Sequence, residues 1–234
     1  MQQTRQIGLG AVQLLPQTYQ ICVPLRDFEL HSQYINLTDF SLNAVQPIDR
    51  LFNQLYHREI VHAQLNMLGS HDTPRIANVA AFDRTAVSLI FLCQMTVPGA
   101  PNIYYGDEIG MRGRHDPDCR RAFPWENEAN WDQEMRRDVR RFIKLRQQIP
   151  ALRRGDFKVI HANGNVVAYQ RQCGESQAII AFNVGQGRGS FNCPKEMPSQ
   201  LRLQQGEAAA TLSAGQTVDL DGRTGAVWSN QLER

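Results

Sequence analysis

Short apolar runs alternate with helical periodicities through the middle of this 234-residue chain, and no other feature limits its fold as strongly. Residues 64–69 and 102–105 are strand-like, the second run being β-branched and aromatic. Residues 47–58, 83–96 and 134–148 repeat apolar side chains at spacings of three and four, which predicts helices. The order strand, helix, strand, helix is typical of a parallel sheet covered by helices. The middle of the chain is therefore predicted to be α/β.

The predicted helix at 134–148 combines an apolar stripe with many basic side chains. The stripe that we expect to be buried continues past the helix end and consists of Met135, Val139, Phe142, Leu145, Ile149 and Leu152. The basic residues are Arg136, Arg137, Arg140, Arg141, Lys144 and Arg146. They indicate either a nucleic-acid-binding face or a solvated face opposite the stripe. The regular stripe favours the solvated face, so we expect no nucleic-acid partner.

The two ends of the chain differ from its middle. Residues 1–38 show no sustained period and stay unassigned. From residue 156 onward, short apolar runs are separated by turn signals at 163–164, 185–187 and 221–222. This pattern predicts a small antiparallel β domain.

Composition and charge exclude several classes of function. The formal net charge is +2, and no run of about 18 apolar residues could span a bilayer, so we expect no membrane partner. The N-terminus lacks a convincing secretory signal. The five cysteines are scattered without a CxxC pair, which argues against zinc and for free thiols in a reducing compartment. We expect a cytoplasmic protein without a metal or a cofactor.

Polar residues follow both predicted strands of the middle segment. His71 and Asp72 stand beyond the first strand, in the stretch LGSHDTPRI, and Asp107 and Glu108 stand beyond the second. In a parallel α/β barrel, the residues that act on a substrate lie where strands end and loops begin, which would bring both pairs to one rim. Alternatively, Asp72 and Thr73 cap the next helix by accepting hydrogen bonds from its first amides. Spacing alone leaves both interpretations open.

Longer stretches carry a more specific signal. They are QLNMLGSHDTPRI, QMTVPGAPNIYYGDEIGMRG, HDPDCRRAFPWE and the helix that ends in IPALRRGDF. From about residue 60 to its end, the chain resembles the C-terminal part of glycoside hydrolase family 13, the α-amylase family. The stretch HDPDCRRAFPWE is similar to the branch of neopullulanases, cyclomaltodextrinases and maltogenic amylases.

The resemblance implies a particular fold. It is the C-terminal portion of a (β/α)8 TIM barrel, about strands six to eight, followed by a small antiparallel β-sandwich domain. Strand seven would end at Gly69, and strand eight would span 102–105. We therefore expect an unassigned segment at 1–38, a partial barrel at 39–155 and the sandwich domain at 156–234.

The resemblance also implies roles for individual residues. Asp72 matches the family's third catalytic carboxylate, which binds sugar hydroxyls and stabilises the transition state, and His71 matches its sugar-binding neighbour. Asp116 and Arg120 match positions that line the donor-side sugar subsites. An alternative role for Arg120 is an ion pair with Asp116 or Asp118 that merely shapes the loop.

Other polar and aromatic residues of the same loops are expected to be structural. Asp107 and Glu108 belong to a family signature, and we expect them to support the strand-eight loop. Trp125 and Tyr105 could stack on sugar rings, but packing in the core or within the loops is favoured for both.

The family cleaves α-1,4-glucosidic bonds of maltodextrins and cyclodextrins by a retaining mechanism, which needs a nucleophilic carboxylate and a proton-donating one. The 234 residues contain no Gly-Phe-Arg-x-Asp stretch for the nucleophile, and no strand that matches the acid/base Glu. We therefore expect an α-glucan oligosaccharide as the ligand and no hydrolysis by this chain alone. The alternatives are a noncatalytic α-glucan-binding module and a fragment that is complemented by an N-terminal half of the barrel. A homo-oligomer is a further expected assembly.

Overall fold

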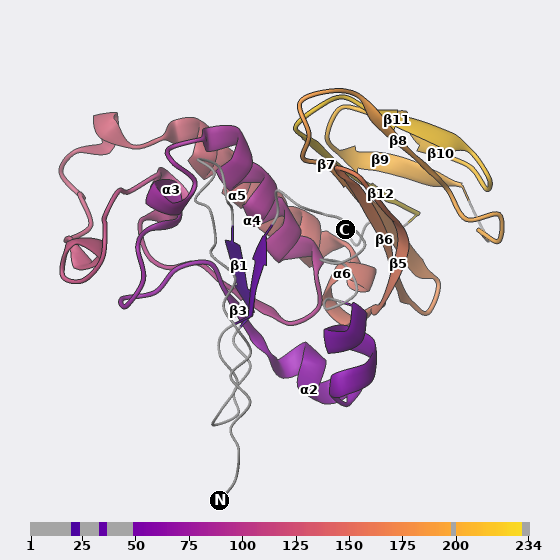
Figure 1. Cartoon of the computed structure of the whole chain (residues 1–234), viewed down its shortest axis with the longest axis horizontal. Coiled ribbons are helices and arrows are strands. Elements are labelled where there is room, and N and C mark those ends of the chain that lie inside the picture. Colours follow the sequence, from indigo (N-terminus) through magenta and orange to yellow (C-terminus); the bar gives the residue numbers. More distant parts are fainter. Residues whose placement is uncertain (1–19, 24–32, 37–48, 198–199, 231–234) are drawn as a thin grey trace, which may run out of the picture.

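The computed structural model of the chain describes residues 20–23, 33–36, 49–197 and 200–230. Two long helices, α4 (Arg84–Thr96) and α5 (Gln133–Gln148), lie between a small sheet on one side and antiparallel strands on the other (Figure 1). Within this described part, no helix combines the length and the apolar character needed to cross a membrane.

The small sheet has the strand order β2-β1-β3-β4. Its members are β1 (Gln20–Val23), β2 (Gln33–Asn36), β3 (Leu65–Met67) and β4 (Ala100–Asn102). The strands β3 and β4 are parallel, as the alternation of strand and helix predicts, whereas β1 runs antiparallel to β2 and β3. Two strands thus come from the segment that the sequence left unassigned.

The second predicted strand begins earlier than expected. It occupies 100–102 instead of 102–105, because the positive φ of Gly99 (98°) turns the chain directly into the ladder, where Ala100 N donates to Gln64 O. Tyr104 and Tyr105 then leave the sheet, and both rings stack on the guanidinium of Arg75. Their aromatic character serves this contact, which the local sequence pattern did not indicate.

The predicted helices at 83–96 and 134–148 are confirmed, each with an aspartate at its N-terminus. Asp83 accepts a hydrogen bond from Ala86 N, and Asp132 accepts from Glu134 N and Met135 N. The whole predicted stripe of the second helix is buried. The helix predicted at 47–58 is wrong as a single element, because the chain is extended at Tyr56 between a π-helical turn and α2. The shorter helical elements are η1 (Leu51–Leu55), α2 (Arg58–Ala63), α3 (Ile76–Val79), η2 (Asp107–Ile109), η3 (Asp118–Arg120), η4 (Glu128–Asn130) and α6 (Pro150–Arg154).

One basic residue of α5 departs from the predicted solvated face. Arg137, Arg140, Arg141 and Lys144 are exposed, as expected. Arg146 is buried, and its guanidinium donates to the carbonyl groups of residues 95, 97 and 99. These carbonyls lie at and beyond the C-terminal end of α4, where helical partners run out, so a buried cation takes the place of the missing amides.

The C-terminal residues form two antiparallel sheets. The larger has the order β10-β9-β12-β7-β6-β5, and the smaller pairs β11 with β8. The predicted turns at 185–187 and 221–222 fall between strands and the one at 163–164 begins at the last residue of a strand, which confirms the antiparallel β prediction. The strands are β5 (Asp156–Asn163), β6 (Val166–Cys173), β7 (Ser176–Asn183), β8 (Gly189–Asn192), β9 (Leu201–Gln205), β10 (Thr211–Leu212), β11 (Thr217–Leu220) and β12 (Thr224–Ser229).

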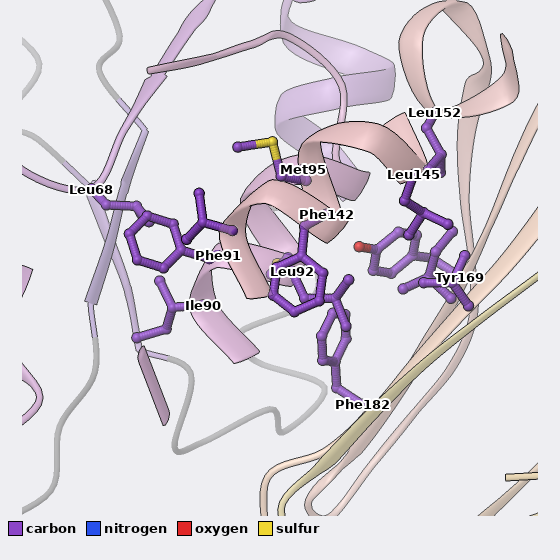
Figure 2. Close-up of a cluster of buried hydrophobic side chains, with 14 of the residues drawn as sticks. Leu68, Ile90, Phe91, Leu92, Met95, Phe142, Leu145, Leu152, Tyr169 and Phe182 are labelled. Carbon is purple, nitrogen blue, oxygen red and sulfur yellow. The ribbon is translucent and has the colours of Figure 1, made fainter. Parts of the chain in front are cut away.

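The larger sheet is covered on both faces. Every residue of the central strand β7 is buried. One face packs against the helices, where Leu92 of α4, Phe142 of α5 and Phe182 of β7 lie together in one cluster (Figure 2). The other face carries a second cluster, in which Phe191 and Trp228 pack together. The helices and the antiparallel sheet therefore share a continuous core.

A buried arginine joins the sheet to the helices. Arg171 of β6 is fully buried and donates to the carbonyls of Thr96, Gly155 (2.9 Å) and Asp156 (3.2 Å). Burial lowers the pKa of Arg171 to about 9, with a smaller contribution from Arg146, so it still carries its charge at neutral pH. Its contacts fix the end of α4 against the start of the β domain.

Replacing Arg171 with Met is expected to lower the free energy of unfolding by about 3 kcal/mol, because three carbonyls lose a charged donor. Arg202→Met, on the exposed face of β9, is the matched control, and we expect a change within about 0.5 kcal/mol. Urea titration followed by circular dichroism measures both values. Equal effects of the two substitutions would contradict the role given to Arg171.

Candidate active site

The four residues that the sequence predicts as site residues form one cluster. Arg120 Nη2 lies 3.2 Å from Asp72 Oδ1, and Arg120 Nε lies 2.8 Å from Asp116 Oδ1. The same Nε donates to His71 O at 3.0 Å, and the His71 ring nitrogen Nε2 lies 3.1 Å from Asp72 Oδ2. The loop that follows β3 and the loop around η3 therefore meet through Arg120.

The cluster is open to solvent. The side chain of Asp72 is 68% exposed and that of Arg120 is 47% exposed. Ion pairs at such positions contribute little to stability, because water screens them. A polar ligand can therefore replace these contacts at small cost, which suits a binding surface better than a structural support.

The helix-capping alternative for Asp72 and Thr73 is wrong. Helix α3 begins at Ile76, and Arg75 is its N-terminal flanking residue without a side-chain capping bond. Asp72 instead turns toward Arg120. Thr73 Oγ1 accepts from Ser70 N at 2.9 Å, so the hydroxyl stabilises the turn that precedes the helix.

The alternative prediction, that Arg120 pairs with Asp116 or Asp118 of its own loop, is confirmed for Asp116 only. Its pair with Asp116 is present, but Asp118 pairs with Arg121 and also accepts from Arg114 N at 2.6 Å. Arg120 also contacts His71 and Asp72 on the other loop, so its contacts do more than shape its own loop.

A buried arginine beneath the cluster holds three loops together. Arg75 donates through Nε to Cys119 O at 2.9 Å and through Nη1 to Tyr105 O, and its backbone N donates to Gly113 O at 2.9 Å. The rings of Tyr104 and Tyr105 lie 4.2 and 4.5 Å from its guanidinium carbon. Sequence reasoning missed Arg75, because its importance comes from partners about 30 and 44 positions away.

Asp107 is the buried counter-ion of this arginine. Its Oδ1 lies 3.2 Å from Arg75 Nη1, while Oδ2 has no hydrogen-bond partner among the described residues. Burial raises the pKa of Asp107 to about 7, although Arg75 acts in the opposite direction. A Cβ at Gly69 would lie 2.8 Å from Oδ2, so only glycine allows this approach. The geometry agrees with the expected supporting role of Asp107.

The remaining expectations concern metals and aromatic residues. No group of His, Cys, Asp and Glu that could hold a metal ion occurs among the residues that the structure describes. Tyr105 packs on Arg75 and donates through its hydroxyl to Arg121 O at 2.9 Å. Trp125 lies outside the core, since it is 73% exposed, but its ring packs on that of Phe123 within the loop, as one of the two expected kinds of packing.

Comparison with known proteins places the chain in a family. Residues 16–156 match the family model described as alpha amylase, catalytic domain. The chain therefore belongs to the α-amylase family. The match begins at residue 16, so it includes part of the segment at 1–38 that the sequence left unassigned.

Individual relatives lie in the branch that the sequence indicates. A cyclomaltodextrinase from Geobacillus thermopakistaniensis is 41% identical over 146 residues, which are 61% of this chain and 25% of the relative. A maltogenic alpha-amylase from Bacillus acidopullulyticus is 31% identical over 197 residues, or 81% of this chain and 32% of the relative. The chain thus spans about a quarter to a third of these curated relatives.

Solved structures of glycoside-cleaving enzymes also match the chain in fold. The debranching enzyme from Nostoc punctiforme matches with a TM-score of 0.74 and 38% identity, over 82% of this chain and 40% of that chain. An alpha-amylase from Geobacillus thermoleovorans, solved with acarbose, matches with a TM-score of 0.71 and 25% identity over 85% of this chain.

The pH dependence of stability tests the state of Asp107. Its pKa is raised from 3.8 to about 7, so the folded chain binds this proton more tightly, and stability falls as the pH rises from about 4 to about 7. Over this pH range, the free energy of unfolding of the wild type is expected to fall by up to about 4 kcal/mol relative to that of Asp107→Asn, because asparagine does not titrate. If the free energy of unfolding changes equally with pH in the two proteins, the raised pKa of Asp107 is contradicted.

Proposed function

We propose that the exposed cluster of His71, Asp72, Asp116 and Arg120 binds an α-glucan. The observation that carries the proposal is that one guanidinium, from Arg120, lies between two exposed carboxylates on different loops. Carboxylates accept hydrogen bonds from sugar hydroxyls, and the arginine offers several fixed donors to hydroxyl oxygens. Alternating donors and acceptors at an open surface suit a neutral, polyhydroxylated ligand.

The chemistry of glycoside cleavage gives Asp72 its role. Breaking an α-glucosidic bond develops oxocarbenium character and distorts the ring. A carboxylate that accepts hydrogen bonds from two hydroxyls binds the distorted ring more strongly than the relaxed one, so it stabilises the transition state. Arg120 and the His71 ring orient this carboxylate, since each lies within 3.2 Å of one of its oxygens.

The intact enzyme type that we infer is a retaining glycosidase of α-1,4-glucosidic bonds in maltodextrins or cyclodextrins. Membership of the α-amylase family supports this inference, as do the relatives called cyclomaltodextrinase and maltogenic alpha-amylase. A retaining reaction needs a nucleophile and a proton donor about 5–5.5 Å apart. We propose that residues 39–155 form part of a barrel that carries the third carboxylate, and that residues 156–234 form the sandwich domain.

A second candidate is complementation by the N-terminal half of a barrel. The observation that favours it is a group of exposed apolar side chains around α2 and the start of β3, namely Leu55, Ile60 and Leu65. Covering exposed apolar side chains with a partner removes apolar surface from water, which favours association. A noncatalytic α-glucan-binding module is the remaining alternative. A cytoplasmic location is part of the proposal and is supported by the free thiols of Cys93, Cys119, Cys173 and Cys193.

Substitution at Arg120 tests glucan binding. Arg120→Ala is expected to weaken the binding of maltohexaose about tenfold, because the loss of hydrogen bonds from a charged group costs roughly 1.5 kcal/mol. Arg121→Ala is the matched control, since Arg121 is the next residue, is exposed and pairs with Asp118 of its own loop. Isothermal titration calorimetry measures both affinities. If the two variants bind equally well, the cluster is not the glucan site.

Assays of hydrolysis separate the catalytic from the binding interpretation. The purified chain is expected to release no reducing sugar from maltodextrin or cyclodextrin, because a third carboxylate cannot break the bond without a nucleophile and a proton donor. Sugar release that disappears in Asp72→Asn would overturn this expectation. Activity that appears only after addition of a polypeptide carrying the N-terminal half of a family barrel would favour complementation.

A further inference from the structure

Trp125 differs from the other tryptophans of the chain in its exposure to water. The sequence contains three tryptophans, and the exposed fractions are 73% for Trp125, 8% for Trp131 and none for Trp228. An indole is a large amphipathic group that proteins bury at least in part or use for contact with ligands. The exposed position of the Trp125 indole therefore indicates a contact with a ligand or a partner.

The exposed indole is held in place by a stack of aromatic rings. The ring of Phe123 lies 4.3 Å from that of Trp125 with a tilt of 42°, and it meets Trp131 edge to face at 5.4 Å. Trp131 is itself fixed, since its Nε1 donates to Pro124 O at 3.1 Å and Arg136 lies over its ring. A ring that is ordered before binding loses little conformational freedom when a ligand stacks on it.

The same loop carries the stack of aromatic rings and two residues of the cluster, Asp116 and Arg120. Trp125 follows Arg120 by five residues, which limits the separation of their Cα atoms to about 18 Å. Between them, Arg121 O accepts a hydrogen bond from the hydroxyl of Tyr105, whose ring packs on the buried Arg75. The loop is thus fixed to the same buried base on which the cluster rests.

We propose that Trp125 is a stacking platform for glucose units that extend beyond the cluster, so that the chain binds long maltooligosaccharides more tightly than short ones. The proposal rests on the proposed glucan-binding function. The apolar face of a glucose ring packs on an aromatic ring, while its hydroxyls stay in water at the rim. The cluster then recognises the first units by hydrogen bonds, and Trp125 adds affinity that depends on chain length.

Affinities for short and long ligands test the platform. Trp125→Ala is expected to bind maltotriose within about twofold of the wild type and maltoheptaose roughly three- to tenfold more weakly. Trp125→Phe keeps an aromatic face and is expected to retain most of the affinity for maltoheptaose. Phe82→Ala removes another exposed aromatic ring, on a different loop, and is the control that leaves both affinities unchanged.

Tryptophan fluorescence supplies a readout that needs no catalysis. Because the other two tryptophans are buried, quenching by acrylamide reports mainly on Trp125. Saturating maltoheptaose is expected to protect the indole from quenching, and saturating maltotriose is not.

Each contrary result has its own meaning. If maltotriose and maltoheptaose bind equally well to the wild type and to Trp125→Ala, the platform is overturned and the glucan cluster stands. If neither sugar binds, the proposed function fails, and this inference fails with it. Protection of Trp125 that rises with protein concentration in the absence of sugar would identify a contact between copies and would also overturn the platform.

Discussion

Carbonyl groups that have lost their regular hydrogen-bond partners are the constraint on which this structure depends. They occur at the end of α4, between α6 and β5, and in the loops beneath the cluster of His71, Asp72, Asp116 and Arg120, and buried arginines satisfy them. Arg75, Arg146 and Arg171 each donate to at least two such groups. Burying a cation is costly, but several strong hydrogen bonds to carbonyl oxygens offset that cost. Removing one of these arginines would leave polar backbone groups unsatisfied in the interior.

This arrangement separates a fixed base from an adaptable surface. The base consists of Arg75, its counter-ion Asp107 and the two tyrosine rings that enclose the guanidinium. The surface consists of the ion pairs around Arg120, which are exposed and weak. In the function that we propose, a glucan exchanges with the surface contacts without disturbing the base. Binding sites that keep their shape when the ligand leaves avoid a large entropic cost on binding.

The success and failure of sequence reasoning follow the range of the interactions involved. The helices α4 and α5 and the buried stripe were predictable, since helical periodicity and N-terminal aspartates are local signals. The buried position of Arg146 was not, because its acceptors come from another helix. The strand at 100–102 was predicted two residues too late, because the aromatic residues Tyr104 and Tyr105 looked strand-like. Their rings instead pack on the distant Arg75. The side chains of the cluster and a pair between Arg120 and Asp116 could be named in advance, but the contact of Arg120 with Asp72 on the other loop could not.

The sequence by itself determined the family, the helices α4 and α5, the antiparallel strands of the C-terminal part and the identity of the residues that we propose bind sugar. Periodicity and motifs record these properties within short windows of the chain. Only the tertiary structure decided that Asp72 faces Arg120 instead of capping α3, and that Trp125 stands in solvent on a stack of aromatic rings. The physical reason is that hydrogen bonds and burial depend on distances between segments that lie far apart in the sequence.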